Sequence, residues 1–242
     1  MEYRQVVAGK FLRRPNRFVA FCAVEGQEVK CHVPNTGRCR ELLIPGRRVY
    51  LAVSDNPNRA TRYSLVAVDK EGLLVNMDSG APNRAVEETI LSLALPGMAP
   101  LAGYRREARF RQSRFDFFLW DEAGREAYLE VKGVTLFEGA AARFPDAPTE
   151  RGIRHIHELM AAREEGYQAY LLFVVQARGL EYVAPNDPGG TEFGDALRLG
   201  VAHGVVPLAY DCTVAPQGMW LHEPLPVCLI ERDLNLEGGC EH

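Results

Sequence analysis

Long apolar runs are absent from this chain of 242 residues, and no stretch approaches the roughly 20 apolar residues that a membrane-spanning helix needs. Its opening segment, MEYRQVVAGKFLRR, has no apolar core of the kind found in signal peptides. We therefore expect a cytoplasmic protein. With 47% hydrophobic and 25% charged residues, the chain has a globular composition, which excludes extensive disorder.

Paired cysteines are also absent. The six cysteines are scattered and form no C-x-x-C pair, which excludes the usual signals of a zinc ribbon or a redox motif. We expect them to be reduced and to serve as small apolar side chains. No helix-turn-helix pattern with a basic recognition helix is found, which disfavours a sequence-reading repressor.

Charge is unevenly distributed along the chain. Residues 1–80 hold 13 Lys and Arg against 8 Asp and Glu, a net charge of +5, whereas residues 81–242 hold 15 against 24, a net charge of -9. The two values add up to the overall net charge of -4. If a nucleic acid is the partner, its phosphates are expected on the N-terminal third.

The N-terminal third has the pattern of a small β-barrel. Short β-rich runs lie between Phe11 and Asn76, and Gly, Pro and Asn clusters such as PNTGR and DNPNR separate them. The runs are RFVAFCAV, EVKCHV, RRVYLAV, RYSLVAV and GLLVN. About five strands without helical periodicity are typical of an oligonucleotide-binding (OB) barrel, so we predict an OB-like domain over residues 1–80.

Polar residues of this barrel are candidates for holding a nucleic acid. Arginines interspersed with aromatic rings suit single strands, although most of the rings are needed for the barrel core. The PNTGR turn presents backbone amides, a hydroxyl and a guanidinium, which suits a phosphate, yet its Pro, Asn and Gly are equally explained by turn geometry. The predicted contacts are Arg13, Arg14, Arg17, Asn35, Thr36, Arg38, Arg47 and Arg48.

Residues 81–242 have the pattern of a mixed sheet flanked by helices. The helical run AVEETILSLAL follows the boundary SGAPNR, and then come three strand-like runs that predict an antiparallel meander. After an irregular loop, Thr149 can cap a helix that ends at Gly166, and the buried strand QAYLLFVVQ follows it. This order implies a parallel crossover. A further helix (GDALRLGVAHG) and strand (VVPLAYDCTV) extend the sheet, and the remainder is predicted to be a tail.

Three charged residues of the meander are predicted to converge. Because strands alternate their faces, Glu130 and Lys132 share one side of their strand. If the DEAGRE turn pairs Trp120 with Glu126, Asp116 lies opposite Glu130 on that same side. Two facing carboxylates repel each other unless a cation lies between them, and a divalent metal with Lys132 beside it would supply that charge. The alternative is a solvated ion pair with an unrelated aspartate.

Oxygen ligands of this kind suit Mg²⁺ or Mn²⁺, which bind through one or two carboxylates together with waters and a substrate phosphate. The metal would activate water, and the lysine would neutralise charge that develops on the phosphate. The candidate catalytic residues are therefore Asp116, Glu130 and Lys132, with Asp116 and Glu130 as metal ligands.

The order helix, three-stranded meander, helix and strand, with SRFDFFL and YLEVKGVTL on the second and third strands, resembles the PD-(D/E)XK nuclease core. Together with CHVPNTGRCRELLIPG, NPNRATRYSL, FPDAPTERGIRHIHEL and GVVPLAYDC, these strings resemble the sugar fermentation stimulation protein family, SfsA. The resemblance implies an α/β (mixed α+β) protein with an OB-like barrel and a nuclease-like domain. It also implies DNA binding linked to the regulation of sugar metabolism.

The resemblance also suggests further site residues. Glu88 lies where many such nucleases place an extra acid, although neighbouring Glu87 is an alternative. Glu150, Arg151 and His155 can line the cleft, or else serve the helix and its surface. The leading hypothesis is a Mg²⁺-dependent nuclease that acts on DNA. The alternatives are a non-catalytic DNA-binding regulator with a vestigial site and, third, a protein that binds another phosphate-rich ligand such as RNA.

Overall fold

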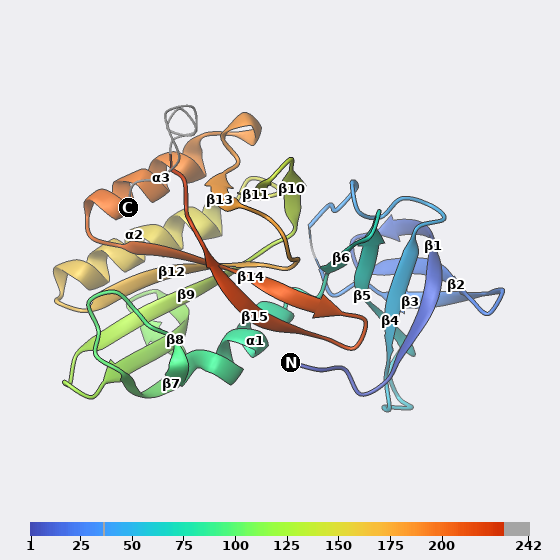
Figure 1. The fold of residues 1–242 in the computed structure, drawn as a ribbon, viewed down its shortest axis with the longest axis horizontal. Helices are drawn as coiled ribbons and strands as arrows, with labels where there is room; N and C mark the ends of the chain where they lie inside the picture. The colour runs from blue at the N-terminus through green and yellow to red at the C-terminus, as the bar shows by residue number, and fades with distance from the viewer. Residues whose placement is uncertain (36, 230–242) are drawn as a thin grey trace.

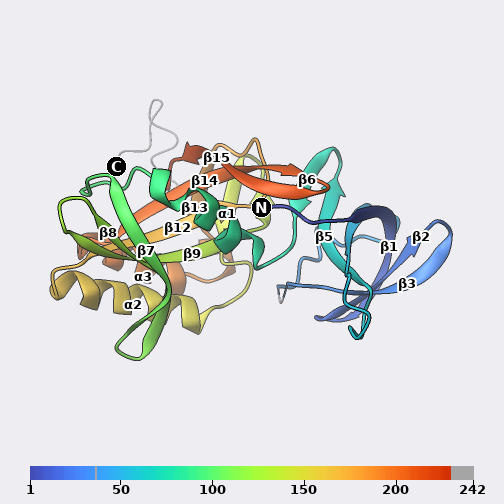
Figure 2. The ribbon, with the colours of Figure 1, turned by 90° about the horizontal axis from the view of Figure 1, so that it is seen from below.

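The computed structural model describes residues 1–35 and 37–229. A β-barrel built from the N-terminal strands lies beside a mixed sheet that is covered by helices (Figure 1). The first residues cross from the barrel to the second sheet, where Glu2 bridges to Gly218, and Figure 2 shows the N-terminus beside β15 (Gly218–Leu225). Within the described ranges, no helix is long and apolar enough to cross a membrane.

The N-terminal sheet is a closed barrel. Its strand order is β3-β2-β1-β4-β5-β6, and a parallel pairing of β3 with β5 closes five of the strands on themselves. The OB-like barrel is thus confirmed, but the sequence analysis missed its first strand, β1. Two register shifts against β2 interrupt the alternation of inward and outward side chains along β1. The strands are β1 (Val6–Asn16), β2 (Val19–Val24), β3 (Gln27–His32), β4 (Arg48–Val53), β5 (Tyr63–Lys70) and β6 (Leu73–Asn76).

The larger sheet has the order β15-β14-β12-β9-β8-β7. Strand β12 runs parallel to β9 and β14, and the other pairings are antiparallel, so the predicted meander and mixed sheet are confirmed. The remaining strands of this sheet are β7 (Leu101–Phe110), β8 (Ser113–Asp121), β9 (Glu126–Val134), β12 (Gln168–Val175) and β14 (Val206–Ala215).

Helices cover both faces of this sheet (Figure 1). Helix α1 packs its buried alanines and Val86 against Leu129 and Val131, whereas α2 packs Ile156 and Leu159 on the opposite face. These two burial patterns bring α1 and α2 to the same stretch of β9 from opposite sides. The helical elements are α1 (Ala81–Thr89), η1 (Ile90–Ser92), α2 (Glu150–Glu164), η2 (Asp187–Gly189) and α3 (Glu192–Ala202).

Three expectations are wrong. The presumed tail contains β15, which pairs with β14, and the presumed irregular loop contains two short strands. These strands, β10 (Leu136–Glu138) and β11 (Ala141–Phe144), form a small sheet with β13 (Tyr182–Pro185). Their sequences are too short to show a period of two. The third error concerns the cysteines: Cys228 is disulfide-bonded, whereas four others are free and buried.

Gln176 joins the barrel to the larger sheet. This buried side chain follows β12, and its Nε2 donates hydrogen bonds to the backbone oxygens of Asn76 and Asp78 at the end of β6. The backbone amide of Asn76 in turn donates to the Gln176 carbonyl. Since a buried amide left without partners costs about 1–3 kcal/mol, these bonds favour one arrangement of the two parts.

Candidate functional site

The site lies where β8 and β9 separate. The predicted pairing of Trp120 with Glu126 is observed, and the register continues only as far as Phe117 opposite Leu129. On its other side, β9 stays paired with β12 as far as Val134. Beyond Leu129, β9 is therefore paired on one side only. This places Glu130 and the residues after it at an opening within the sheet.

Asp116 occupies the point of separation. Its Oδ2 accepts a hydrogen bond from the Val131 amide at 2.8 Å, and its Oδ1 accepts one from Asn83 Nδ2 at 2.6 Å. Burial, together with the neighbouring negative charge of Glu130, raises the pKa of Asp116 to about 6, even though both hydrogen bonds favour the ionised form. Glu130 thus lies close enough to oppose the ionisation of Asp116.

Glu130 is the more deeply buried of the two carboxylates and is 3% exposed. Lys132 Nζ donates to its Oε1 at 2.7 Å, and His155 Nδ1 contacts the same oxygen. Burial alone would raise the pKa of Glu130, but the hydrogen bond with His155 and the charge of Lys132 outweigh it and hold that pKa below its ordinary value. Oε2 of Glu130 is buried without a hydrogen-bond partner among the described residues.

These carboxylates fit a hydrated divalent cation. The unpartnered Oε2 of Glu130 is a buried acceptor, and the pKa of Asp116 is raised by burial and, second, by the negative charge of Glu130 beside it. In the part of the chain that the structure describes, no group of three or more His, Cys, Asp and Glu side chains is arranged to hold a metal ion. Two carboxylates suit Mg²⁺ or Mn²⁺, which keep waters and take substrate oxygens, better than a metal that needs a full set of protein ligands.

The other predicted site residues are only partly brought together. His155 reaches Glu130, and Arg151 Nε donates to His155 Nε2 at 3.4 Å. Glu150 lines a separate hollow on the outer side of α2. Glu88 is not brought to the site, because its carboxylate pairs with the N-terminal ammonium of Met1.

Asn83 is the site residue that the sequence analysis missed. It lies in the first turn of α1, within the SGAPNR segment that was taken as a boundary, and it reaches across to Asp116. Glu87 lies one turn further along the same helix face, where it contacts Arg106 and the Tyr104 hydroxyl. An asparagine beside Pro82 in a Gly- and Pro-rich segment is normally explained as a turn residue, so the local pattern carried no signal for this role.

Arginines line a groove of about 530 Å³ on the barrel. We call this hollow the barrel groove. Beside it, the ring of Phe18 is 49% exposed and lies 5.0 Å from the Arg17 guanidinium, which is a pairing suited to a stacked base. The basic residues that line the barrel groove are Arg13, Arg14, Arg17, Arg38 and Arg40.

Several predicted phosphate contacts are engaged within the protein. Arg14 donates to the carbonyl oxygen of Arg17 and to three carbonyl oxygens of residues between 35 and 38. Arg47 donates to the carbonyls of Glu41 and Leu42. Both side chains therefore hold loops in place. The Gly37 amide donates a hydrogen bond to the Asn35 side chain. This favours the alternative in which the PNTGR residues serve the geometry of the turn and do not bind a phosphate.

The remaining predicted contacts differ in their surroundings. Arg13 forms an exposed ion pair with Glu28, and Arg48 is exposed on β4 outside the residues that line the barrel groove. Thr36 lies outside the described residues. Arg17 and Arg38 are exposed residues that line the barrel groove, so they are the predicted contacts best placed to meet a phosphate.

Together, the closed barrel and the mixed sheet that carries Asp, Glu and Lys at a strand separation define a protein with an OB domain and a mixed α/β domain. The chain belongs to the sugar fermentation stimulation protein family. Residues 12–77 match the family profile described as "SfsA N-terminal OB domain", and residues 80–218 match the one described as "Sugar fermentation stimulation protein RE domain".

Relatives resemble the chain over almost its whole length. It is 44% identical over 229 residues to the sugar fermentation stimulation protein homolog of Clostridium novyi, covering 95% of this chain and 100% of the relative. The homolog of Desulfitobacterium hafniense strain Y51 is 46% identical over 232 residues, covering 96% and 100%. The structure of Pyrococcus furiosus SfsA in complex with Ca²⁺ superposes with a TM-score of 0.83 at 29% identity, covering 94% of this chain and 97% of that one.

Proposed function

We propose that this protein binds DNA on its barrel and hydrolyses phosphodiester bonds at Asp116, Glu130 and Lys132 with Mg²⁺ or Mn²⁺. The observation that carries the proposal is the buried Glu130 carboxylate, which has one oxygen held by Lys132 and the other without a partner among the described residues, beside a second carboxylate. The P. furiosus relative was solved with Ca²⁺, which prefers oxygen ligands as Mg²⁺ does.

Each residue has a distinct part in this proposal. Asp116 and Glu130 would hold the metal, which when bound would lower the pKa of a water and neutralise phosphate charge. Lys132 presents an ammonium beside Glu130 that stabilises negative charge on the substrate phosphate. Asn83 and His155 orient the two carboxylates from opposite faces of the sheet.

The test is cleavage of labelled single-stranded and duplex DNA by purified protein with Mg²⁺ or Mn²⁺. We expect cleavage that EDTA abolishes, and we expect Asp116→Asn and Lys132→Gln to lower the rate by roughly a hundredfold to a thousandfold. DNA affinity measured in EDTA should change little, because these side chains lie outside the barrel groove. Asp195→Asn is the matched control, since Asp195 is an exposed residue of α3.

Two results would count against the hydrolytic part of the proposal. If the protein binds DNA but cleaves no form of it with either metal, the non-catalytic regulator becomes the better hypothesis. If Asp116→Asn cleaves as fast as the unaltered protein, the catalytic centre lies elsewhere. A link to the regulation of sugar metabolism rests on the family alone, and measuring sugar-dependent transcription in a strain that lacks the protein would test it.

A further inference from the structure

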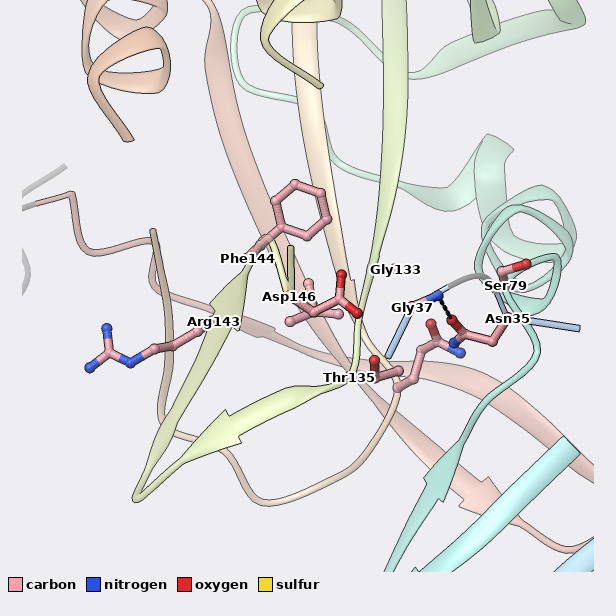
Figure 3. A pocket seen from close by; sticks show the side chains of 10 residues that line it. Asn35, Gly37, Ser79, Gly133, Thr135, Arg143, Phe144 and Asp146 are labelled. Atoms are coloured by element: carbon pink, nitrogen blue, oxygen red, sulfur yellow. Dashed lines mark hydrogen bonds between the residues drawn. The ribbon is translucent and has the colours of Figure 1, made fainter. Parts of the chain in front are cut away.

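A cavity of about 140 Å³ lies between the barrel and the larger sheet (Figure 3). It is lined from the barrel side by Asn35 and Gly37, from the larger sheet by Gly133, and from the loop after β11 by Asp146, among others. A cavity of about 150 Å³ holds one benzene-sized ring, so the volume suits a single planar base better than a larger ligand. We call it the junction pocket.

The junction pocket meets both parts of the proposed DNA path. Gly37 lines it and also lines the barrel groove, so the two hollows share a wall. On the opposite side is Gly133, which directly follows Lys132 in the part of β9 that is paired on one side only. Gly133 is exposed although it lies in a central strand, and a Cβ there would come within 2.5 Å of the Gln176 side chain and 2.8 Å of Pro82, so a glycine is required by packing.

The side chains that line the junction pocket favour hydrogen-bond donors over phosphate. Figure 3 shows Asp146 directed toward Gly37 and the centre of the pocket, whereas the Arg143 guanidinium points away from it. Arg143 is ion-paired with Glu138. The Asp146 carboxylate lies near the Arg38 side chain and accepts hydrogen bonds from the backbone amides of Arg38 and Ala147. A carboxylate has about four acceptor positions, so it can also accept hydrogen bonds from the amino group of a base.

Phe144 supplies an aromatic surface in the junction pocket. Its ring lies 5.6 Å from that of Phe173 and 4.9 Å from that of Phe193, and these contacts fix its orientation. Stacking on a fixed ring together with hydrogen bonding to the base edge is how enzymes hold a base that has left its stack.

From this geometry we infer that the junction pocket binds one nucleobase with an exocyclic amino group, from a DNA strand that runs from the barrel groove to Lys132. Asp146 accepts the amino hydrogens and Phe144 offers its ring. This inference rests on the proposed function, because it needs DNA on the barrel. It goes further in predicting that adenine, cytosine or guanine is preferred over thymine at one position.

The experiment measures binding in EDTA, so that cleavage plays no part. A thymidine decamer is compared with decamers that carry one 2-aminopurine, a fluorescent base with an amino group. We expect the single amino-bearing base to tighten binding by roughly threefold to tenfold and its fluorescence to change on binding. Asp146→Asn should reduce this preference to less than about twofold, because one carboxylate acceptor becomes a donor.

A blocking variant separates this inference from the proposed function. Ser79 is an exposed residue at the pocket, so Ser79→Tyr can obstruct the pocket without disturbing buried packing, and Ser92→Tyr on exposed η1 is its control. Ser79→Tyr should abolish the 2-aminopurine response while affinity for the thymidine decamer stays within about twofold. An unchanged response in Ser79→Tyr, or no preference over thymine in the unaltered protein, overturns the pocket alone. Failure of the unaltered protein to bind any decamer overturns the pocket and the proposed DNA binding together.

Discussion

At the scale of single residues, the two carboxylates are held in different ways. Asp116 receives one hydrogen bond from α1 and one from β9, and Glu130 receives its bonds from Lys132 and α2. Asn83 and His155 therefore position these carboxylates, although neither carries out the proposed chemistry itself. Partners of this kind commonly change activity by about 10-fold to 100-fold when they are removed.

Asn83→Ala tests this dependence. Without the amide, Oδ1 of Asp116 has lost its donor, and we expect cleavage to slow by about 10-fold to 100-fold with unchanged affinity for DNA in EDTA. A weaker apparent affinity for Mn²⁺ should accompany the loss, because Asp116 is less well oriented. Leu91→Ala, at an exposed position of η1, is the control. If Asn83→Ala retains the full rate, the Asn83 hydrogen bond has no part in the chemistry.

The raised pKa of Asp116 predicts a pH-dependent stability of the metal-free protein. An unfolded aspartate titrates near 3.8, and Asp116 in the folded protein titrates near about 6, so the folded state binds more protons between these values. The destabilisation is absent below about pH 4 and complete above about pH 6. Asp116→Asn should therefore increase the free energy of unfolding at pH 7.5 by on the order of 1–2 kcal/mol and change it little at pH 4.

Urea denaturation in EDTA measures both values. The stabilised variant is expected to be the inactive one, which is the usual conflict between stability and a functional site that brings like charges together. A variant less stable than the unaltered protein at pH 7.5 would show that the hydrogen bonds to Asp116 outweigh the repulsion from Glu130.

At the scale of elements, the sequence predicted most of the framework and part of the site. Alternation placed Glu130 and Lys132 on one side of β9, and the turn set the register as far as Phe117 and Leu129. The predicted pairing of Asp116 with Glu130 is not formed, because the two strands separate at this point. What could not be predicted arises from tertiary contacts. Asn83 reaches Asp116 only because α1 packs across β9, and the loops held by Arg14 and Arg47 look from the sequence like exposed cationic segments.

Helix α2 begins where the sequence predicted, and its cap can be tested. The Thr149 side chain accepts a hydrogen bond from the Gly152 amide at 3.0 Å, so Thr149→Ala should lower the free energy of unfolding by about 1 kcal/mol. Because this helix carries His155 toward Glu130, the rate of cleavage should fall together with the free energy of unfolding. Thr149→Ser keeps the hydroxyl and should restore both quantities. If Thr149→Ser is as unstable as Thr149→Ala, the methyl group and not the cap matters.

At the scale of the whole molecule, the proposed function gives the barrel and the larger sheet separate tasks, and the structure gives them a fixed junction. Gln176 bonds the end of β12 to the end of β6, and the Asp146 carboxylate lies so close to Gly37 that a Cβ there would come within 2.2 Å of it. Under the proposed function, a strand bound to the barrel groove would thus be presented to the opening in β9 in one orientation. Binding and cleavage should consequently respond to different substitutions.

Reversing charge in the barrel groove tests this division. Arg17→Glu and Arg40→Glu change exposed residues of the barrel groove, and each should weaken DNA binding and lower the slope of log affinity against log salt by about 1. The cleavage rate at saturating DNA should stay nearly constant. Arg59→Glu, at an exposed loop position of the barrel, is the control. Arg47 is unsuited to this test because its reversal would release the loop that it holds. Equal loss of affinity in Arg59→Glu would point to net charge alone as the cause.

The amide of Val131 is held by the Asp116 side chain at the point where the neighbouring strand has moved away. The Val131 amide loses this hydrogen bond whenever the Asp116 oxygen binds another partner. Its NMR resonance and its rate of exchange with deuterium therefore report on what Asp116 binds. Titrating the protein with a divalent cation while following this one signal would reveal loading of the site without any substrate present.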